Sequence, residues 1–141
     1  MTTKVVLLSI RPRYAEKLFN GTKRVELRRM KPRLNEGDIV LIYVSSPVKE
    51  LQGRFEVETV LEKPVDELWA YVWKDAGISK KEFDEYYSGA ERGCGIYLRA
   101  PASIRKPIGL DDLRELWSDF HPPQSYRYLS ASELSVVASA M

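Results

Sequence analysis

Residues 21–28 read Gly-Thr-Lys-Arg-Val-Glu-Leu-Arg, and the other predicted elements are arranged around this stretch. Over residues 23–29 apolar and charged residues alternate, which predicts a strand with two unlike faces. Val25 and Leu27 share the apolar face. The charged face carries Arg24, Glu26 and Arg28. Gly21 stands where a helix would end in a left-handed residue, so we expect a helix just before the strand.

The elements next to this stretch follow from equally local patterns. Lys4–Ile10 is apolar and rich in β-branched residues, as is typical of a strand buried on both faces. Pro12 suits the first turn of a helix over Arg13–Asn20. On the C-terminal side, Asn35–Asp38 predicts a turn and Ile39–Val44 a second apolar strand.

Further along the chain, Gln52–Glu62 alternates like a half-buried strand, and Ser79 with Glu82 has the capping-box spacing of a helix start. The other predicted elements are helices over 64–76, 80–87 and 110–117, a strand over 96–100 and its continuation as strand or extended chain over 101–108. About six short strands with inserted helices, and no regular β-α-β alternation, predict an α+β domain on a small curled sheet or β-barrel. We expect residues 1–129 to form this single domain and residues 130–141 a tail that is a weak helix or disordered.

The composition indicates a folded protein and excludes several classes. With 141 residues, of which 44% are apolar and 11% aromatic, the chain can bury a core, so it is not expected to be disordered. No apolar run approaches the ~18–20 residues of a membrane span, and the N-terminus lacks a signal-peptide pattern, so we expect a cytoplasmic protein. The single cysteine, Cys94, excludes an internal disulfide framework and a cysteine-based zinc site. The low content of Asn and Gln is typical of thermophiles.

Charge is distributed unevenly along the chain. Residues 11–33 hold nine basic and two acidic side chains, a charge of +7, which leaves −5 elsewhere because the total is +2. A one-sided basic segment suits phosphate-rich partners such as RNA, since each neutralised phosphate releases counterions. The alternative is a solvated surface whose charges pair with the acidic remainder.

The stretch 21–28 fits the pattern G-x-K-x-x-E-x-R, and it precedes Gly37-Asp38-Ile39-Val40 in the expected place. In this respect the chain, from Lys4 to about Ile108, resembles the ASCH domain, a branch of the PUA-like superfamily of small β-barrels. The segment Pro122–Leu129, PPQSYRYL, is similar to the tail of archaeal ASCH-type proteins. The resemblance implies RNA binding or a link to translation. Some similar proteins are hydrolases: one deacetylates N4-acetylcytidine, and RNA cleavage is proposed for another.

The resemblance also implies a pocket around Lys23, Glu26 and Arg28. The Lys23 ammonium suits a phosphate or carbonyl oxygen, and Glu26 and Arg28 can bind a ligand together or bind each other. From residue types alone, an exposed ladder of ion pairs along Arg24, Glu26 and Arg28 is the favoured interpretation, and only the resemblance favours the pocket.

The amidohydrolase members have a nucleophilic threonine at the position of Glu26 and a third acid in the middle segment, near Asp75. Because a glutamate cannot replace an activated hydroxyl, we do not expect that deacetylation here. An acid–base pair of Lys23 and Glu26 acting on a phosphodiester is the alternative enzymatic interpretation.

Further candidate ligand-binding residues lie outside the motif. They are Arg11, Arg13, Tyr14, Ser45, Ser46, Gln124, Ser125, Tyr126 and Arg127. Arginine forks onto phosphate and aromatic rings stack on bases, but each group also has a structural interpretation. Arg11 and Arg13 suit a solvated helix start, the serines form turns, and residues 124–128 suit an extended strap packed across the barrel.

We therefore predict an RNA- or nucleotide-binding module in RNA metabolism, translation or its regulation, with no cofactor, no metal and no membrane contact. The alternatives are a hydrolase of RNA or of a modified nucleoside, and a protein-binding regulatory module. Monomer and homodimer both stay open. We expect His121 to be a loop residue and Cys94 a small buried side chain. Helical core spacing indicates packing roles for Trp69, Trp73 and Trp117.

Overall fold

The computed structural model describes residues 3–141 of the chain, which form six strands and five helices. The strands are β1 (Val5–Ile10), β2 (Val25–Arg28), β3 (Ile39–Val44), β4 (Glu50–Pro64), β5 (Arg92–Gly109) and β6 (Tyr126–Tyr128). The helices are α1 (Pro12–Asn20), α2 (Val65–Val72), α3 (Lys80–Tyr86), α4 (Leu110–Leu116) and α5 (Ala131–Ala138). The predicted α+β fold with short helices between strands is confirmed.

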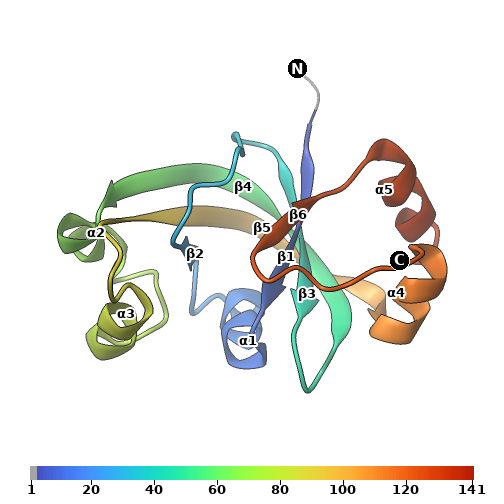
Figure 1. Ribbon diagram of the computed structural model, residues 1–141, viewed down its shortest axis with the longest axis horizontal. Coiled ribbons are helices and arrows are strands. Elements are labelled where there is room, and N and C mark those ends of the chain that lie inside the picture. Colours follow the sequence, from blue (N-terminus) through green and yellow to red (C-terminus); the bar gives the residue numbers. More distant parts are fainter. Residues whose placement is uncertain (1–2) are drawn as a thin grey trace.

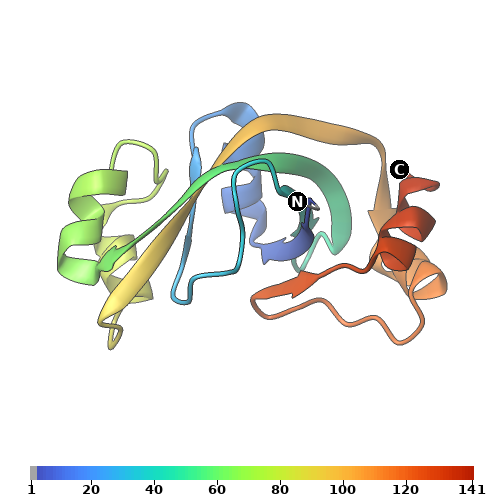
Figure 2. The ribbon, with the colours of Figure 1, turned by 90° about the horizontal axis from the view of Figure 1, so that it is seen from above.

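All six strands belong to one curled sheet in the order β2-β5-β4-β3-β1-β6. Strands β1 and β3 are parallel, and the other neighbours are antiparallel. The long strands β4 and β5 arch across the molecule, with α2 and α3 at one end and α4 and α5 at the other (Figures 1 and 2). Within residues 3–141 the edge strands β2 and β6 do not pair, so the sheet is a half-barrel and not a closed barrel.

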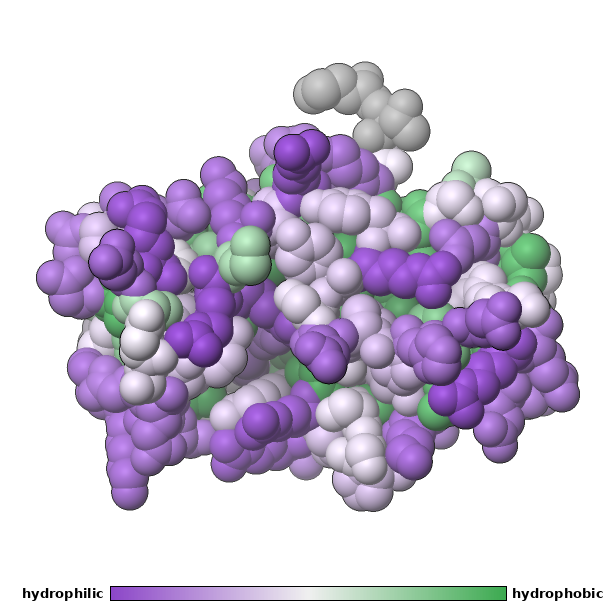
Figure 3. Space-filling view, viewed as in Figure 1, coloured by the Kyte–Doolittle hydropathy of each residue, from purple (hydrophilic) through white to green (hydrophobic). Residues whose placement is uncertain are grey.

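Three clusters of buried apolar side chains hold this sheet. The first lies between α1 and strands β1, β3, β4 and β5, and includes Leu8, Leu18 and Phe55. The second packs α4 and α5 against the opposite face of β1 and β3. The third packs α2 and α3 against Val25 and Leu27 of β2, which confirms the apolar face predicted for that strand. Polar residues dominate the face seen in Figure 3, where apolar residues show only in small separate groups.

Local signals located several element boundaries well. Pro12 is the first residue of α1, and Gly21 caps its end at φ 86°, donating its N–H to the Leu18 carbonyl oxygen. Ser79 and Glu82 form the predicted capping box of α3. Strand β3 covers the predicted residues. Such boundaries depend on residues close in sequence, so they can be read without the tertiary structure.

Two elements differ from prediction. Helix α2 ends at Val72 because the chain turns at residues 73–75, and this leaves Trp73 52% exposed, so its predicted packing role is wrong. Trp69 and Trp117 do pack against the apolar clusters. Strand β5 begins before the predicted start at Ile96 and continues through the segment predicted as strand or extended chain, because it pairs with β4 from Arg92 to Gly109, with several register shifts.

The last residues form a helix packed on the rest of the molecule. Ser130 caps α5 with a capping box to Glu133, and Val137 is fully buried against the cluster that holds α4. The Trp117 indole donates a hydrogen bond of 3.0 Å to the Glu133 carbonyl oxygen. Residues 131–138 therefore form a helix docked on α4 and the sheet. Separately, none of the helices within residues 3–141 has the length and apolarity needed to cross a membrane.

Candidate functional site

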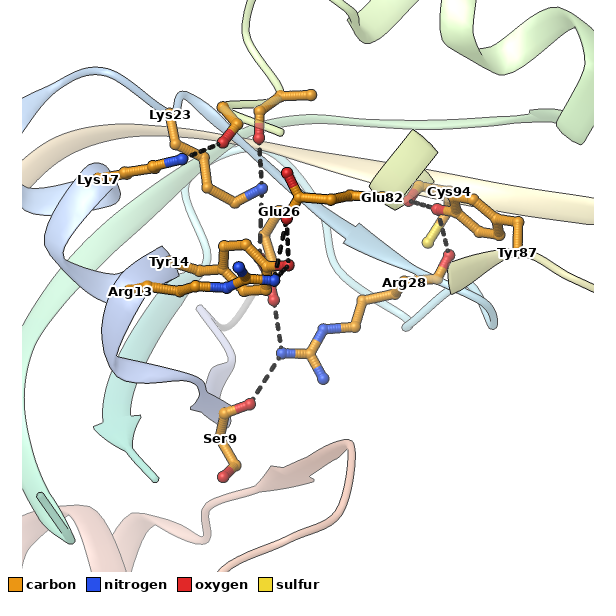
Figure 4. Close-up of polar contacts among 12 residues, drawn as sticks. Ser9, Arg13, Tyr14, Lys17, Lys23, Glu26, Arg28, Glu82, Tyr87 and Cys94 are labelled. Carbon is orange, nitrogen blue, oxygen red and sulfur yellow. Dashed lines mark hydrogen bonds and ion pairs between the residues drawn. The ribbon is translucent and has the colours of Figure 1, made fainter. Parts of the chain in front are cut away.

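A cleft of about 440 Å³ lies between α1, α3 and the charged face of β2. Seven predicted site residues line it: Arg11, Arg13, Tyr14, Lys23, Glu26, Arg28 and Gln124. Figure 4 shows how several of these side chains lie toward one another from different elements. The tertiary structure thus brings the motif, the helix start and one residue of the C-terminal segment to a single site.

Lys23 lies just before β2 and is only 3% exposed. Its Nζ donates a hydrogen bond of 2.6 Å to the Ala76 carbonyl oxygen, lies 4.0 Å from Glu26 Oε1 and stands 5.3 Å from the centre of the Tyr14 ring. Burial lowers the pKa of the Lys23 ammonium, and the nearby Glu26 carboxylate opposes this shift only in part. The Lys23 ammonium therefore loses its proton more easily than an exposed lysine does.

Glu26 and Arg28 form a buried ion pair in β2. Arg28 Nη2 lies 2.7 Å from Glu26 Oε2, and both side chains are 9% exposed. Arg24, on the same strand face, is exposed. The interpretation of an exposed ladder is therefore wrong, because the curl of the sheet covers Glu26 and Arg28.

The Arg28 guanidinium also joins the two sides of the half-barrel. Nη2 donates a hydrogen bond of 3.1 Å to the Ser9 carbonyl oxygen of β1, and Nη1 one of 3.1 Å to the Ser125 carbonyl oxygen beside β6. Within the described residues Arg28 Nε is buried without a partner. At the other end of the residue, the Tyr87 hydroxyl lies 3.0 Å from the Arg28 carbonyl oxygen. These contacts hold Glu26 in one place.

At the rim of the cleft, side chains of α1 contact a side chain of α3. Arg13 Nη2 lies 2.9 Å from Glu82 Oε2 and donates a hydrogen bond of 2.7 Å to the Tyr14 hydroxyl. That hydroxyl in turn donates to Glu82 Oε2 at 3.3 Å. A hydrogen bond from the Ser79 backbone, with Arg13 nearby, holds the pKa of the Glu82 carboxyl below its usual range.

Sequence reasoning missed several lining residues. They are Ser9, Ile10, Leu27, Ile78, Glu82, Glu85 and Tyr86. Glu82 had a clear local signal as a capping residue, but no local pattern places α3 against α1. The acids that the middle segment brings to the cleft are Glu82 and Glu85, and Asp75 does not line it. Asp75 instead accepts backbone hydrogen bonds from Arg24 and Val25 through its carbonyl oxygen.

Other predicted site residues do not line this cleft. Ser45 and Ser46 follow β3 in a turn. Ser125 contacts Arg28 through its backbone carbonyl oxygen. Tyr126 packs against the first apolar cluster. Arg127 makes an ion pair with Glu133 and lies over the rings of Trp117 and Phe120. The segment after Ser125 therefore has the contacts of a packed strap.

Cys94 and His121 lie where the sequence predicted, in the core and in a loop. Cys94 is fully buried in β5, and burial raises the pKa of its thiol to about 11. His121 is exposed in the loop after α4. Neither lines the cleft.

Known proteins share this fold, and some of them are also similar in sequence. A Zymomonas mobilis protein named ASCH domain-containing ribonuclease is 32% identical over 136 residues, covering 96% of this chain and 91% of that protein. The crystal structure of ASCH from Zymomonas mobilis superposes with a TM-score of 0.90 at 32% identity, covering 96% of this chain and 94% of that one. Human THYN1, solved with DNA containing 5-methylcytosine, shares the fold at a TM-score of 0.61 and 12% identity, over 98% of this chain and 97% of that one.

A profile of the ASCH domain family matches residues 8–99, a range that runs from the end of β1 through α1 and the GTKRVELR stretch into the first part of β5. Together with the Zymomonas mobilis relative, this match shows that the chain belongs to the ASCH domain family.

Proposed function

We propose that this protein binds RNA and takes one nucleotide of the strand into the cleft. The observation that carries the proposal is the placement of Lys23, Glu26 and Arg28 on the floor of a cleft whose mouth carries Arg11 and Arg13. Burying charged groups is costly unless they are paired, and buried charges that also face a cleft are commonly functional. A volume of about 440 Å³ suits a ligand the size of a nucleotide.

The charge distribution and the relatives support the same proposal. The +7 segment over residues 11–33 supplies all four basic residues that line the cleft. The Zymomonas mobilis relative is named a ribonuclease, and THYN1 was solved in complex with DNA. Both names support nucleic-acid binding by this fold. We also assign the half-barrel to the PUA-like superfamily on the same grounds, with a role in RNA metabolism, translation or its regulation.

The binding proposal is tested by fluorescence anisotropy with a labelled single-stranded RNA over a series of salt concentrations. We expect binding at low salt that weakens steeply as salt rises. The double variant Arg11→Glu/Arg13→Glu should lose about 1–3 kcal/mol of binding free energy. The control Arg105→Glu/Lys106→Glu makes the same charge change at exposed residues outside the cleft, and should lose less.

Absence of RNA binding at low salt would contradict the proposal. Equal losses in the two double variants would also contradict it, because they would place the RNA outside the cleft. If the protein is instead a regulatory module that binds another protein, no RNA binding at low salt is expected.

RNA cleavage in the same cleft is the second candidate, favoured by the name of the 32% identical relative. Among the described residues Glu26 Oε1 accepts no hydrogen bond, and Lys23 Nζ lies 4.0 Å from it, so this oxygen is available to accept a proton. In such a reaction Glu26 takes the proton of a ribose 2′-hydroxyl, whose oxygen attacks phosphorus. The bond from phosphorus to the 5′-oxygen then breaks, and that oxygen receives a proton from the Lys23 ammonium.

Cleavage is tested by incubating end-labelled RNA with the wild-type protein, Lys23→Met and Glu26→Gln. The expected result is cleavage by the wild type and none by either variant, with RNA binding retained by Glu26→Gln. Cleavage that survives both substitutions would exclude this pair of residues. N4-acetylcytidine serves as a second substrate and should stay intact, because Glu26 stands in place of the nucleophilic threonine.

A further inference from the structure

The rim of the cleft holds one carboxylate oxygen between two donors. Glu82 Oε2 lies 2.9 Å from Arg13 Nη2 and accepts the Tyr14 hydroxyl at 3.3 Å (Figure 4). The two donors come from α1 and the carboxylate from α3. A guanidinium beside a phenol hydroxyl is also a suitable partner for a phosphate oxygen. The Glu82 oxygen therefore stands where a phosphate oxygen of a ligand would bind.

The floor of the cleft suits a different part of a nucleotide. Glu26 is buried there between Lys23 and Arg28, and a phosphate at the floor would face its carboxylate. Both terminal nitrogens of Arg28 are already engaged by Glu26 and by the carbonyl oxygens of Ser9 and Ser125. An uncharged base or ribose with its own donors and acceptors fits this floor better, which leaves the 5′-phosphate of that nucleotide at the rim.

We propose that Arg13 and Tyr14 bind an RNA phosphate at the rim and that Glu82 competes with this phosphate in the free protein. The inference rests on the proposed RNA binding and adds to it the position of the phosphate and a built-in competitor. Displacement is feasible because the Arg13 side chain is 60% exposed and that of Glu82 31%, and ion pairs at this exposure are weak.

The capping box allows Glu82 to release Arg13 without unfolding α3. Its Oε1 accepts a hydrogen bond of 3.1 Å from the Ser79 backbone N–H, and the Ser79 hydroxyl accepts one of 3.1 Å from the Glu82 N–H. Only Oε2 takes part in the contacts with Arg13 and Tyr14. A phosphate can thus replace one oxygen while the other still caps the helix. Glutamine at this position keeps an oxygen for the cap but loses the charge.

The experiment compares Glu82→Gln with the matched variant Glu85→Gln, measuring the Kd of a labelled single-stranded RNA at one fixed salt concentration. Glu85 lies on α3 and lines the same cleft, but within the described residues it makes no ion pair. Glu82→Gln should tighten binding about fivefold, the upper range for release of an exposed ion pair. Glu85→Gln should tighten it less than about twofold, through general electrostatics alone.

The same comparison in an Arg13→Gln background identifies the partner of Glu82. If Glu82 acts through Arg13, the extra gain of Glu82→Gln over Glu85→Gln should vanish there. A nucleoside 5′-monophosphate should show the extra gain, and the corresponding nucleoside should not. Equal effects of the two glutamine variants, or an extra gain that persists without Arg13, would overturn the inference while RNA binding itself stands. Failure of the wild type to bind RNA would instead overturn the proposed function.

Discussion

The Arg28 guanidinium donates a hydrogen bond of 3.1 Å to the carbonyl oxygen of Ser125, a residue 97 positions away. Arg28 is the last residue of edge strand β2, and Ser125 directly precedes the other edge strand, β6. The same guanidinium holds the Glu26 carboxylate at 2.7 Å. One side chain therefore bridges the open side of the half-barrel and positions the carboxylate of the candidate site.

Replacing Arg28 with methionine should strongly destabilise the fold. The change leaves the Glu26 carboxylate buried with a poorly placed partner, Lys23 at 4.0 Å, and removes the bonds across the half-barrel. Breaking a buried pair from one side typically costs about 3–5 kcal/mol. The free energy of unfolding, measured by urea titration, should fall by that order.

Two further variants separate the cause of this loss. Arg29→Met removes a neighbouring arginine that is exposed, so it should cost about 0.5 kcal/mol or less. Adding Glu26→Gln to Arg28→Met should recover part of the loss, because the buried carboxylate that has lost its guanidinium partner is then gone, while Lys23 keeps its hydrogen bond to the Ala76 carbonyl oxygen. A double variant as unstable as Arg28→Met would show that the carboxylate is not the source of the cost.

The lowered pKa of Lys23 predicts a pH dependence of stability. Below both its folded pKa and its usual 10.5, Lys23 is charged in the folded and unfolded states, and its burial costs stability. Between the two values the unfolded chain holds a proton that the folded protein has released, so the free energy of unfolding rises with pH. The free energy of unfolding of the wild type minus that of Lys23→Met should therefore increase as pH rises toward 10.5.

Taking this difference also removes the effect of buried tyrosines. Burial raises the pKa of Tyr87, so its ionisation at high pH favours the unfolded state in both proteins. A difference that stays flat or falls up to pH 10.5 would mean that Lys23 keeps its ordinary pKa in the folded protein.

A methyl group at Gly77 should disturb the site through Lys23. Gly77 has φ +65°, and a Cβ there would lie 2.8 Å from the Lys23 Cβ. Gly89 has φ +81° with nothing within 4 Å of its added Cβ. Both alanine variants carry the strain of a left-handed residue, so Gly77→Ala should be less stable than Gly89→Ala by about 1–2 kcal/mol through overpacking.

RNA binding gives a second measurement on the same pair of variants. Gly77→Ala should weaken binding because it shifts Lys23, while Gly89→Ala should bind like the wild type. Identical stability and binding in the two variants would show that the loop at Gly77 moves away without disturbing Lys23.

The Cys94 thiol should be unreactive in the folded protein. It is fully buried, and its pKa of about 11 leaves little thiolate near neutral pH. An aromatic disulfide reagent at pH 8 should therefore label the protein only when urea unfolds it. Labelling of the native protein at the rate of the unfolded chain would contradict the burial of Cys94.

Much of the local structure could be predicted from residues close in sequence. Pro12 and Gly21 mark the two ends of α1, and Ser79 with Glu82 marks the start of α3. The alternation in 23–29 also separated Val25 and Leu27 from the charged face of β2. Lys23, Glu26 and Arg28 of the motif line one cleft, and their role there stays a prediction.

The sequence by itself therefore determined the elements, the two faces of β2 and the charge of the segment around it, because these depend on neighbours in the chain. Only the tertiary structure decided that the barrel stays open, that Glu82 meets Arg13, and that Arg127 lies over Trp117 and away from the cleft. Those outcomes depend on how far the sheet curls and on which distant elements then pack together. Alternation reports which residues share a face, but a charged face becomes a buried cleft only when other elements cover it.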